Sequence, residues 1–388
     1  MDLQPLPFRS SLDQYQKQAQ DLLEAFHAGD PEAIQRIKQR HPRFLDPKIK
    51  WLPKNVSDAE VQSAALQLAD AQLTVARCCD FQSWSALVEY VEAVTTENSP
   101  VCQFESAVEA VVNGDLAALQ SLLRENPRLV ASRSTRVTHF DPPVHRATLL
   151  HYVAANGVEG NRQKTPHNAV EIATILLQAG AEVDALAGPY GGQCTTMTLL
   201  VSSSHPAKAG LQAALAETLL DFGAAIEGHG SGQWGSPLMT ALTFSYPDAA
   251  EALARRGARV NNIAAAAGLG RLSAARQLLP ASAPGSRHRA LALAAQLGHA
   301  DIVRLLLDAG EDPNRYNPEG MHSHATPLHQ AVCAGHVAVV RLLVERGARL
   351  DIQDTIFKGT PLGWAQYLGQ IEIGQYLRAN GAKTADEC

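Results

Sequence analysis

The chain has 388 residues, of which 46% are hydrophobic and 19% are charged, a composition typical of a soluble folded protein rather than a disordered one. Its 33 Lys and Arg residues against 39 Asp and Glu residues give a formal net charge of −6, and no long basic run is present. This distribution disfavours binding to nucleic-acid phosphates. No stretch approaches the ~18 apolar residues of a membrane-spanning helix, so we expect no membrane association.

The cysteines and the N-terminal residues both favour a reducing compartment inside the cell. Six cysteines at irregular spacing do not form a disulfide framework in a chain of this length, so we expect free thiols. Residues 1–10 contain Asp2 near their start and no apolar run of the kind found in secretory signals. We therefore expect a cytoplasmic protein.

The first hundred residues predict a small helical region. Twelve residues separate Gly29-Asp30 from His41-Pro42, and residues 13–45 are predicted to form a helix pair. Residues 57–94 predict two or three further short helices, with Phe81 and Trp84 as core aromatics. A polar linker at 97–100 divides this region, 1–100, from a second region, 101–388.

A repeating helix pair follows, and its clearest copy spans residues 326–348. Thr326 is a candidate helix N-cap, and Pro327 suits the first helical position. Gly335 and Gly347, twelve residues apart, can end the two helices. The same glycine spacing recurs at 298–310 and 369–381, and 34 residues separate Thr326 from Thr360. Weaker copies extend back to about residue 104.

These marks resemble the ankyrin repeat family, because TPLHQAVCAGHVAVVRLLVERGARLD at 326–351 matches its pattern nearly throughout. The resemblance covers about 104–382, in about eight units. It implies an all-α ankyrin-repeat solenoid of helix-turn-helix units with β-hairpin-like fingers, preceded by the N-terminal helical region. The stretch LADAQLTVARCCDFQSWSALVEYVEAV is similar to a helical module that precedes ankyrin repeats in many bacterial proteins, which implies a bacterial protein.

Three segments are longer than a regular repeat requires: 132–147, 158–168 and 205–212. For example, Gly157 and Gly180 are 23 residues apart where a regular unit has twelve. Such loops tolerate insertion because the entropy of loop closure rises slowly with length. Binding residues also tend to collect in loops.

In ankyrin units, finger tips and the late residues of the first helix face a concave groove. Carried over to this sequence, those positions are His145, Asn156, Tyr190, Gln193, Ser203, Trp234, Phe244, His322, Ser323, Phe357 and Tyr367. Exposed aromatics among them would anchor a partner. The alternative is that several pack against the neighbouring finger. Glu159 with Arg162 could form an ion pair or hold a polar ligand.

Other patterns give weaker hypotheses. His151 and His329 occupy the histidine of the TPLH pattern, where the resemblance implies a bond between neighbouring backbone segments. His322 and His324 could face one side of an extended finger as metal ligands, although no third ligand completes the set. Weak catalytic candidates are Glu159, Tyr190 and His205, and no nucleophile–base motif supports them.

The sequence thus predicts recognition of a protein or peptide partner through the concave groove, centred on residues 132–234. We expect a binding protein rather than an enzyme, with no cofactor and no nucleic-acid partner. The alternative is a pocket, formed by the irregular repeats and their insertions, that binds a small molecule or carries out acid–base chemistry.

Overall fold

The computed structural model describes residues 6–49, 51–228 and 236–387. In this part of the chain the regular elements are helices, and β structure is limited to isolated bridges, so the all-α prediction is confirmed. None of the described helices is long and apolar enough to cross a membrane. The chain divides into two compact units, whose described residues are 6–224 without residue 50 (unit 1), and 225–228 with 236–387 (unit 2).

Unit 1 begins with five helices: α1 (Leu12–His27), α2 (Pro31–Arg40), α3 (Asp58–Gln62), α4 (Leu68–Cys78) and α5 (Trp84–Thr95). The helix pair predicted at 13–45 corresponds to α1 and α2, and residues 57–94 contain the three others. Helix α1 buries Tyr15, Ala19, Leu22 and Phe26, whose spacing of three or four residues places them on one face. That face packs against α2 and α4.

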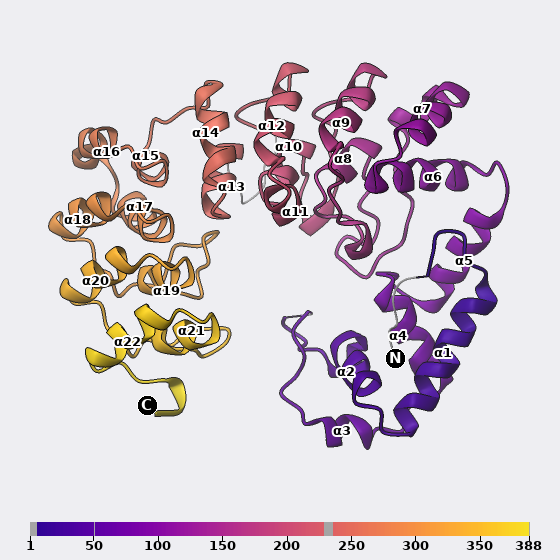
Figure 1. Cartoon of the computed structure of the whole chain (residues 1–388), viewed down its shortest axis with the longest axis horizontal. Coiled ribbons are helices and arrows are strands. Elements are labelled where there is room, and N and C mark those ends of the chain that lie inside the picture. The colour runs from indigo at the N-terminus through magenta and orange to yellow at the C-terminus, as the bar shows by residue number, and fades with distance from the viewer. Residues whose placement is uncertain (1–5, 50, 229–235, 388) are drawn as a thin grey trace. The chain divides into compact units, whose positions relative to one another are not determined.

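Three repeat pairs complete unit 1 (Figure 1). They are α6 (Pro100–Asn113) with α7 (Leu116–Glu125), α8 (Leu149–Val153) with α9 (Ala169–Gln178), and α10 (Thr196–Leu200) with α12 (Gln212–Asp221). Helix α5 packs directly on α6, so the boundary predicted at residue 100 lies inside unit 1. The insertion predicted at 205–212 is partly helical, because α11 (Ser204–Lys208) lies between α10 and α12.

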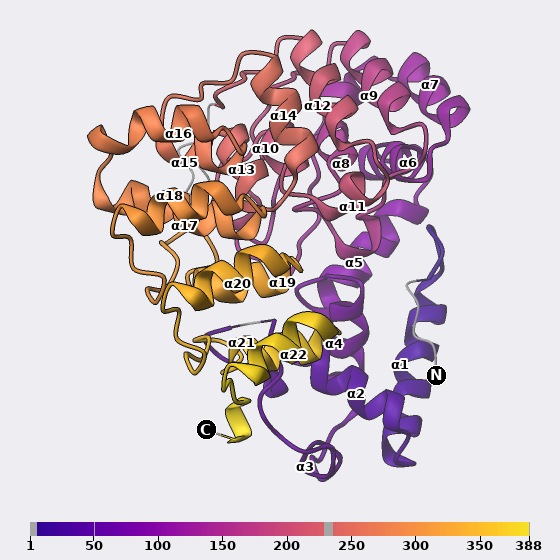
Figure 2. The ribbon, with the colours of Figure 1, turned by 60° about the vertical axis from the view of Figure 1, so that its left-hand side comes forward.

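Unit 2 contains five further pairs: α13 (Pro237–Thr243) with α14 (Pro247–Arg255), α15 (Ile263–Gly268) with α16 (Leu272–Leu278), α17 (Pro284–Gln296) with α18 (Ala300–Asp308), α19 (Pro327–Cys333) with α20 (Val337–Glu345), and α21 (Pro361–Tyr367) with α22 (Ile371–Ala379). From α15 onward the first helices of the pairs form one row and the second helices another (Figures 1 and 2). The described residues of the two units thus hold eight helix pairs.

Short 3-10 turns join several of these helices. They are η1 (Pro42–Phe44), η2 (Pro127–Ala131), η3 (Gly160–Arg162), η4 (Pro189–Gly191), η5 (Leu279–Ala281) and η6 (Ala385–Glu387). The fingers between pairs are hairpin-like but short. Ala187 and Cys194, for example, exchange both backbone hydrogen bonds, at 2.9 and 2.7 Å.

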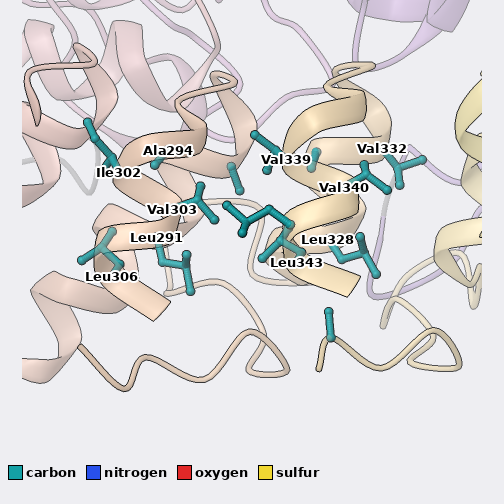
Figure 3. Packing of buried hydrophobic residues seen from close by; sticks show 14 of the residues in the cluster. Leu291, Ala294, Ile302, Val303, Leu306, Leu328, Val332, Val339, Val340 and Leu343 are labelled. Atoms are coloured by element: carbon teal, nitrogen blue, oxygen red, sulfur yellow. The ribbon is translucent and has the colours of Figure 1, made fainter. Parts of the chain in front are cut away.

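Apolar side chains from both rows form the core of unit 2 (Figure 3). Leu328 and Val332 from α19, with Val340 from α20, lie in this cluster, and all three are at most 1% exposed. The cluster continues from Ile263 to Ala382, so each pair is buried by its neighbours as well as by contact between its own two helices.

The two TPLH histidines join neighbouring repeats through the backbone. His151 accepts at Nδ1 from the Thr148 N–H and hydroxyl, and its Nε2 lies 3.3 Å from the Cys194 carbonyl. His329 makes the same contacts with Thr326 and with the Gly359 carbonyl, at 3.2 Å. Burial lowers the pKa of both imidazoles to about 4, although the bonds to the carbonyls act in the opposite direction.

This pKa predicts acid sensitivity. An unfolded histidine binds a proton near pH 6.5, whereas the folded imidazole binds one only near pH 4. The contribution of the neutral imidazole to the unfolding free energy is therefore fully present above pH 6.5 and decreases as the pH falls from 6.5 to 4. We expect about 2 kcal/mol of lost unfolding free energy per histidine between pH 7.5 and 5. Urea unfolding of the wild type and of His329→Gln at both pH values measures this, and the variant should lose less. A stability that rises on acidification would contradict the prediction.

Candidate functional site

Two of the three insertions in unit 1, 132–147 and 158–168, fold back onto the turn between α4 and α5. In the finger 132–147, Val137 accepts at its carbonyl from the Gln82 N–H, and His139 donates its N–H to the Asp80 carbonyl, both at 3.1 Å. In the insertion 158–168, the Gly160 N–H donates to the Asp80 carboxylate at 2.5 Å. Both insertions are therefore attached to the N-terminal helices rather than projecting as loops.

Glu159 is the centre of a buried polar group at this junction. Its Oε1 lies 3.1 Å from Nε2 of His145 and 3.8 Å from Nε of Arg136, and its Oε2 lies 3.9 Å from Nη1 of Arg162. The Nδ1 of His145 accepts from the Ala147 N–H, so Nε2 carries the proton that it donates to Glu159. Burial alone would raise the pKa of Glu159, but Arg136, His145 and Arg162 together hold it well below its usual range.

Arg162 connects this centre to α5 and α6. Its Nη1 donates to Glu105, its Nε lies 3.1 Å from Glu109 Oε1, and its Nη2 lies 3.1 Å from the Tyr90 hydroxyl. Burial would lower the pKa of the guanidinium, but Glu105 and the other acidic neighbours raise it well above its usual value. We name these residues the Glu159 cluster: Tyr90, Glu105, Glu109, Arg136, His145, Glu159 and Arg162.

The Glu159 cluster gathers three residues singled out from the sequence, His145, Glu159 and Arg162, but in an arrangement that differs from the expected one. Their side chains are at most 4% exposed, so His145 and Arg162 are not available to a partner on an open groove. Glu159 stays ionised and held by cations, which makes it a poor proton acceptor. The cluster therefore acts by joining the insertions to α5 and α6.

A second group of predicted residues links α8 to α10. Asn156 donates from Nδ2 to the Ser202 hydroxyl at 2.7 Å and to the Leu199 carbonyl, and it accepts from the Tyr190 hydroxyl at 2.6 Å. Ser203 is buried and donates to the Ala155 carbonyl at 2.9 Å. Asn156 and Ser203 thus tie neighbouring repeats together, and Ser203, like His145, does not face the surface.

Three of the predicted residues of this region are exposed. Tyr190 and Gln193 are exposed on the finger around η4, and His205 is exposed on α11. Among the described contacts, no hydrogen bond or ring contact joins Glu159 to Tyr190 or His205, so the structure does not bring the three catalytic candidates together. Trp234 lies outside the described residues.

In unit 2, two neighbouring fingers, 311–326 and 350–360, are bonded to each other. The Thr355 N–H donates to the His324 carbonyl at 2.9 Å, and the Tyr316 hydroxyl donates to the Gln353 carbonyl at 2.7 Å. The rings of His324 and Phe357 are 6.2 Å apart. We name these side chains, together with Tyr367 at the end of α21, the finger surface: Tyr316, His322, Ser323, His324, Phe357 and Tyr367.

Asp354 shapes the tip of the second finger. Its Oδ1 accepts from the N–H groups of Ile356 and Phe357, and its Oδ2 accepts from the Gly359 N–H and from Nε1 of Trp364. Burial would raise the pKa of Asp354, but these four donors lower it. The buried carboxylate therefore fixes the backbone that presents Phe357.

Phe357 and Tyr367 have 58% and 91% of their surface exposed, which is high for large aromatic side chains. Ser323 is exposed, whereas His322 and Phe244 are half-buried. The Nε2 of His322 lies 3.3 Å from the Thr243 carbonyl at the end of α13. The predicted binding residues of unit 2 thus differ in exposure. Phe357, Tyr367 and Ser323 are open to solvent, whereas His322 and Phe244 are partly covered by the protein.

The histidine pair of the first finger does not form a metal site with other described residues. The ring centroids of His322 and His324 are 6.1 Å apart, and the ring of His324 also lies near that of Trp364. Within residues 6–49, 51–228 and 236–387, no group of three or more His, Cys, Asp or Glu side chains is placed to hold a metal ion.

Sequence reasoning missed Tyr90, Glu105, Arg136 and Asp354. One pattern could have indicated Glu105 and Glu109. They share a helical spacing with Val108 and Val112 of α6, so a carboxylate was predictable on a face that is otherwise apolar. A buried carboxylate requires a cation, and Arg162 of the insertion 158–168 supplies it.

Comparison with known proteins agrees with the repeat pattern. A family model described as ankyrin repeats (3 copies) matches residues 262–354 and 317–387, the region of α15 to α22. The chain is also 44% identical over 77 residues to the ankyrin repeat and SAM domain-containing protein 6 of Mus musculus, covering 20% of this chain and 9% of the relative. The protein of the same name from Rattus norvegicus is 42% identical over 74 residues, 19% of this chain and 8% of the relative.

The chain therefore spans less than a tenth of the length of these relatives, and the likeness concerns the repeats alone. Ankyrin repeats generally mediate contacts between proteins.

Proposed function

We propose that this chain, whose residues 262–387 are ankyrin repeats, recognises a protein or peptide partner through the finger surface of unit 2. The observation that carries the proposal is the exposure of Phe357 and Tyr367, of which Phe357 lies on a finger whose backbone Asp354 fixes. Aromatic side chains of this kind dominate the binding energy of protein interfaces. The bonds made by Asp354 and between the fingers order this region in advance, which reduces the entropy lost on association.

The proposal places the contacts later in the chain than the sequence-based centre at 132–234. Within unit 1, several residues expected in the groove are engaged by the fold, as described for His145 and Ser203. A cytoplasmic bacterial protein is also part of the proposal. It is supported by the helical module at 68–94, and the free cysteines of the described chain fit a reducing compartment.

The test is affinity capture from a lysate of the source organism with the full chain as bait. The variant Phe357→Ala/Tyr367→Ala should recover at least about tenfold less of the proteins that the wild type enriches, because two central anchors are removed. The matched control is Trp51→Ala, since Trp51 is an aromatic residue of unit 1 with 66% of its surface exposed. Circular dichroism checks that all three proteins fold.

Equal recovery by the double variant and the wild type would contradict the proposal. A loss shared by Trp51→Ala would show that capture depends on exposed aromatic surface in general rather than on the finger surface, and would also contradict it.

A further inference from the structure

Unit 1 contains a partly open cavity of about 360 Å³ beside the Glu159 cluster. Its walls come from the segment Leu6–Ser10, from α1, α5 and α6, and from both insertions. The volume lies within the range of small-molecule sites and exceeds the ~150 Å³ cavity that holds benzene. The cavity is remote in sequence from the finger surface, and nothing in the proposed function uses it.

The charged side chains that line this cavity are mostly cationic. Arg9, Arg136, Arg162 and Lys164 face a single lining carboxylate, Glu109. Glu109 is paired with Arg162, at 3.0 Å. Behind the wall, Glu105 and Glu159 offset the two buried guanidinium groups, and Asp80 binds the Gly160 N–H. Arg9 and Lys164 are exposed at the rim, and neither forms an ion pair with a described carboxylate.

Arg136 has hydrogen-bonding capacity left over. It is 6% exposed, and its guanidinium carbon lies 4.1 Å from the centre of the Phe81 ring and 4.8 Å from that of Tyr90. Stacking on aromatic rings leaves the N–H groups at the edge of a guanidinium available. Its Nη2 donates to the Cys79 carbonyl, and its buried Nε lies 3.8 Å from Glu159 Oε1 without a hydrogen bond to it. Nε is therefore turned towards Glu159, and Arg136 would meet a ligand of the cavity through its remaining N–H groups.

The rest of the cavity wall is apolar or neutral. Phe8, Val91, Val94 and Val112 contribute hydrocarbon surface. Tyr15 also lines the cavity, and burial raises its pKa to about 12, so its hydroxyl is a neutral donor at pH 7. A wholly hydrated anion would gain little from such walls, whereas an anion attached to a hydrophobic body would bury that body here.

We infer that this cavity binds a small organic carboxylate with an aromatic or aliphatic body. Arg136 takes the carboxylate, together with the rim cations Arg9 and Lys164, and the valines with Phe8 enclose the body. A guanidinium matches a carboxylate in geometry as well as in charge.

The experiment is isothermal titration calorimetry of the full chain with benzoate and hexanoate as probes. Benzamide is the neutral counterpart of benzoate, and inorganic phosphate is the anion without a hydrophobic body. We expect a Kd of about 1 mM or tighter for at least one of the two carboxylates and none measurable for benzamide or phosphate. The variant Arg9→Gln/Lys164→Gln changes only exposed rim residues and should weaken carboxylate binding about tenfold. Arg124→Gln, an exposed arginine of α7, is the matched control and should bind as the wild type does.

Arg136→Met should abolish binding, and if that variant does not fold, the rim variant decides. Absence of binding by both carboxylates, or equal affinity for benzoate and benzamide, would overturn the inference. Equal affinity of the wild type and the rim variant would also overturn it. Phosphate bound as tightly as the carboxylates would overturn the assignment to an organic ligand.

Discussion

Replacing Arg162 by Met is expected to lower the unfolding free energy of unit 1 by about 3–5 kcal/mol. Arg162 is the cation that Glu105 and Glu159 share, and all three side chains are at most 3% exposed. Without it, two carboxylates would remain buried beside Arg136 alone. The measurement is urea unfolding at pH 7, followed by circular dichroism, with the transition of each unit analysed separately because the chain holds two compact units.

Two further variants separate the loss of charge from the loss of packing. Arg162→Met/Glu105→Gln removes one buried charge of each sign and should regain part of the stability. Arg124→Met changes an exposed arginine of α7 and should stay within about 0.5 kcal/mol of the wild type. If Arg162→Met also remained that close to the wild type, the Glu159 cluster would not hold the junction together.

The second large effect is expected at Asp354, where Asp354→Ala should cost unit 2 about 2–4 kcal/mol. The carboxylate is 1% exposed and accepts from four donors, which the substitution would leave without a partner. Urea unfolding at pH 7 measures the loss.

Asp354→Asn is the graded control, because its amide keeps one oxygen acceptor and loses the other, so its cost should be intermediate. Asp351→Ala removes an exposed carboxylate of the same finger that pairs with Arg349, and it should cost less than about 1 kcal/mol. Equal costs for Asp351→Ala and Asp354→Ala would show that the buried carboxylate does not organise the finger.

The helix pairs could be predicted because their determinants are local. The Thr-Pro start, the glycines that end each helix and the twelve-residue spacing all act within one repeat, so residues 326–348 fold as α19 and α20 as expected. The turn histidines combine a local bond with a bond to the next repeat. His329, for instance, bonds to Thr326 three residues away and to a carbonyl one repeat later.

The Glu159 cluster could not be predicted in the same way. Arg162 meets Glu105 and Glu109 across more than fifty residues, and Arg136 reaches the Cys79 carbonyl across 57. The insertions that carry these arginines have no periodicity that would set their direction. The sequence indicated that 132–147 and 158–168 are irregular, but it did not indicate that both fold back onto α4 and α5.

The solvent exposure of the candidate binding residues could not be predicted from the sequence either. The groove positions carried over from the resemblance include Phe357 and Ser203 alike, yet the first is open and the second is buried. The difference arises because Ser203 bonds to the Ala155 carbonyl and accepts from the buried Gln212 side chain, whereas the second finger of unit 2 presents Phe357 around Asp354.

Hydrogen–deuterium exchange of the full chain, alone and with its captured partner, tests the central claim most directly. If the finger surface is the binding site, the partner should slow exchange in residues 311–326 and 350–367 and leave α16, α18, α20 and α22 unchanged. Protection confined to those second helices or to unit 1, with the two fingers exchanging as they do in the free protein, would contradict it.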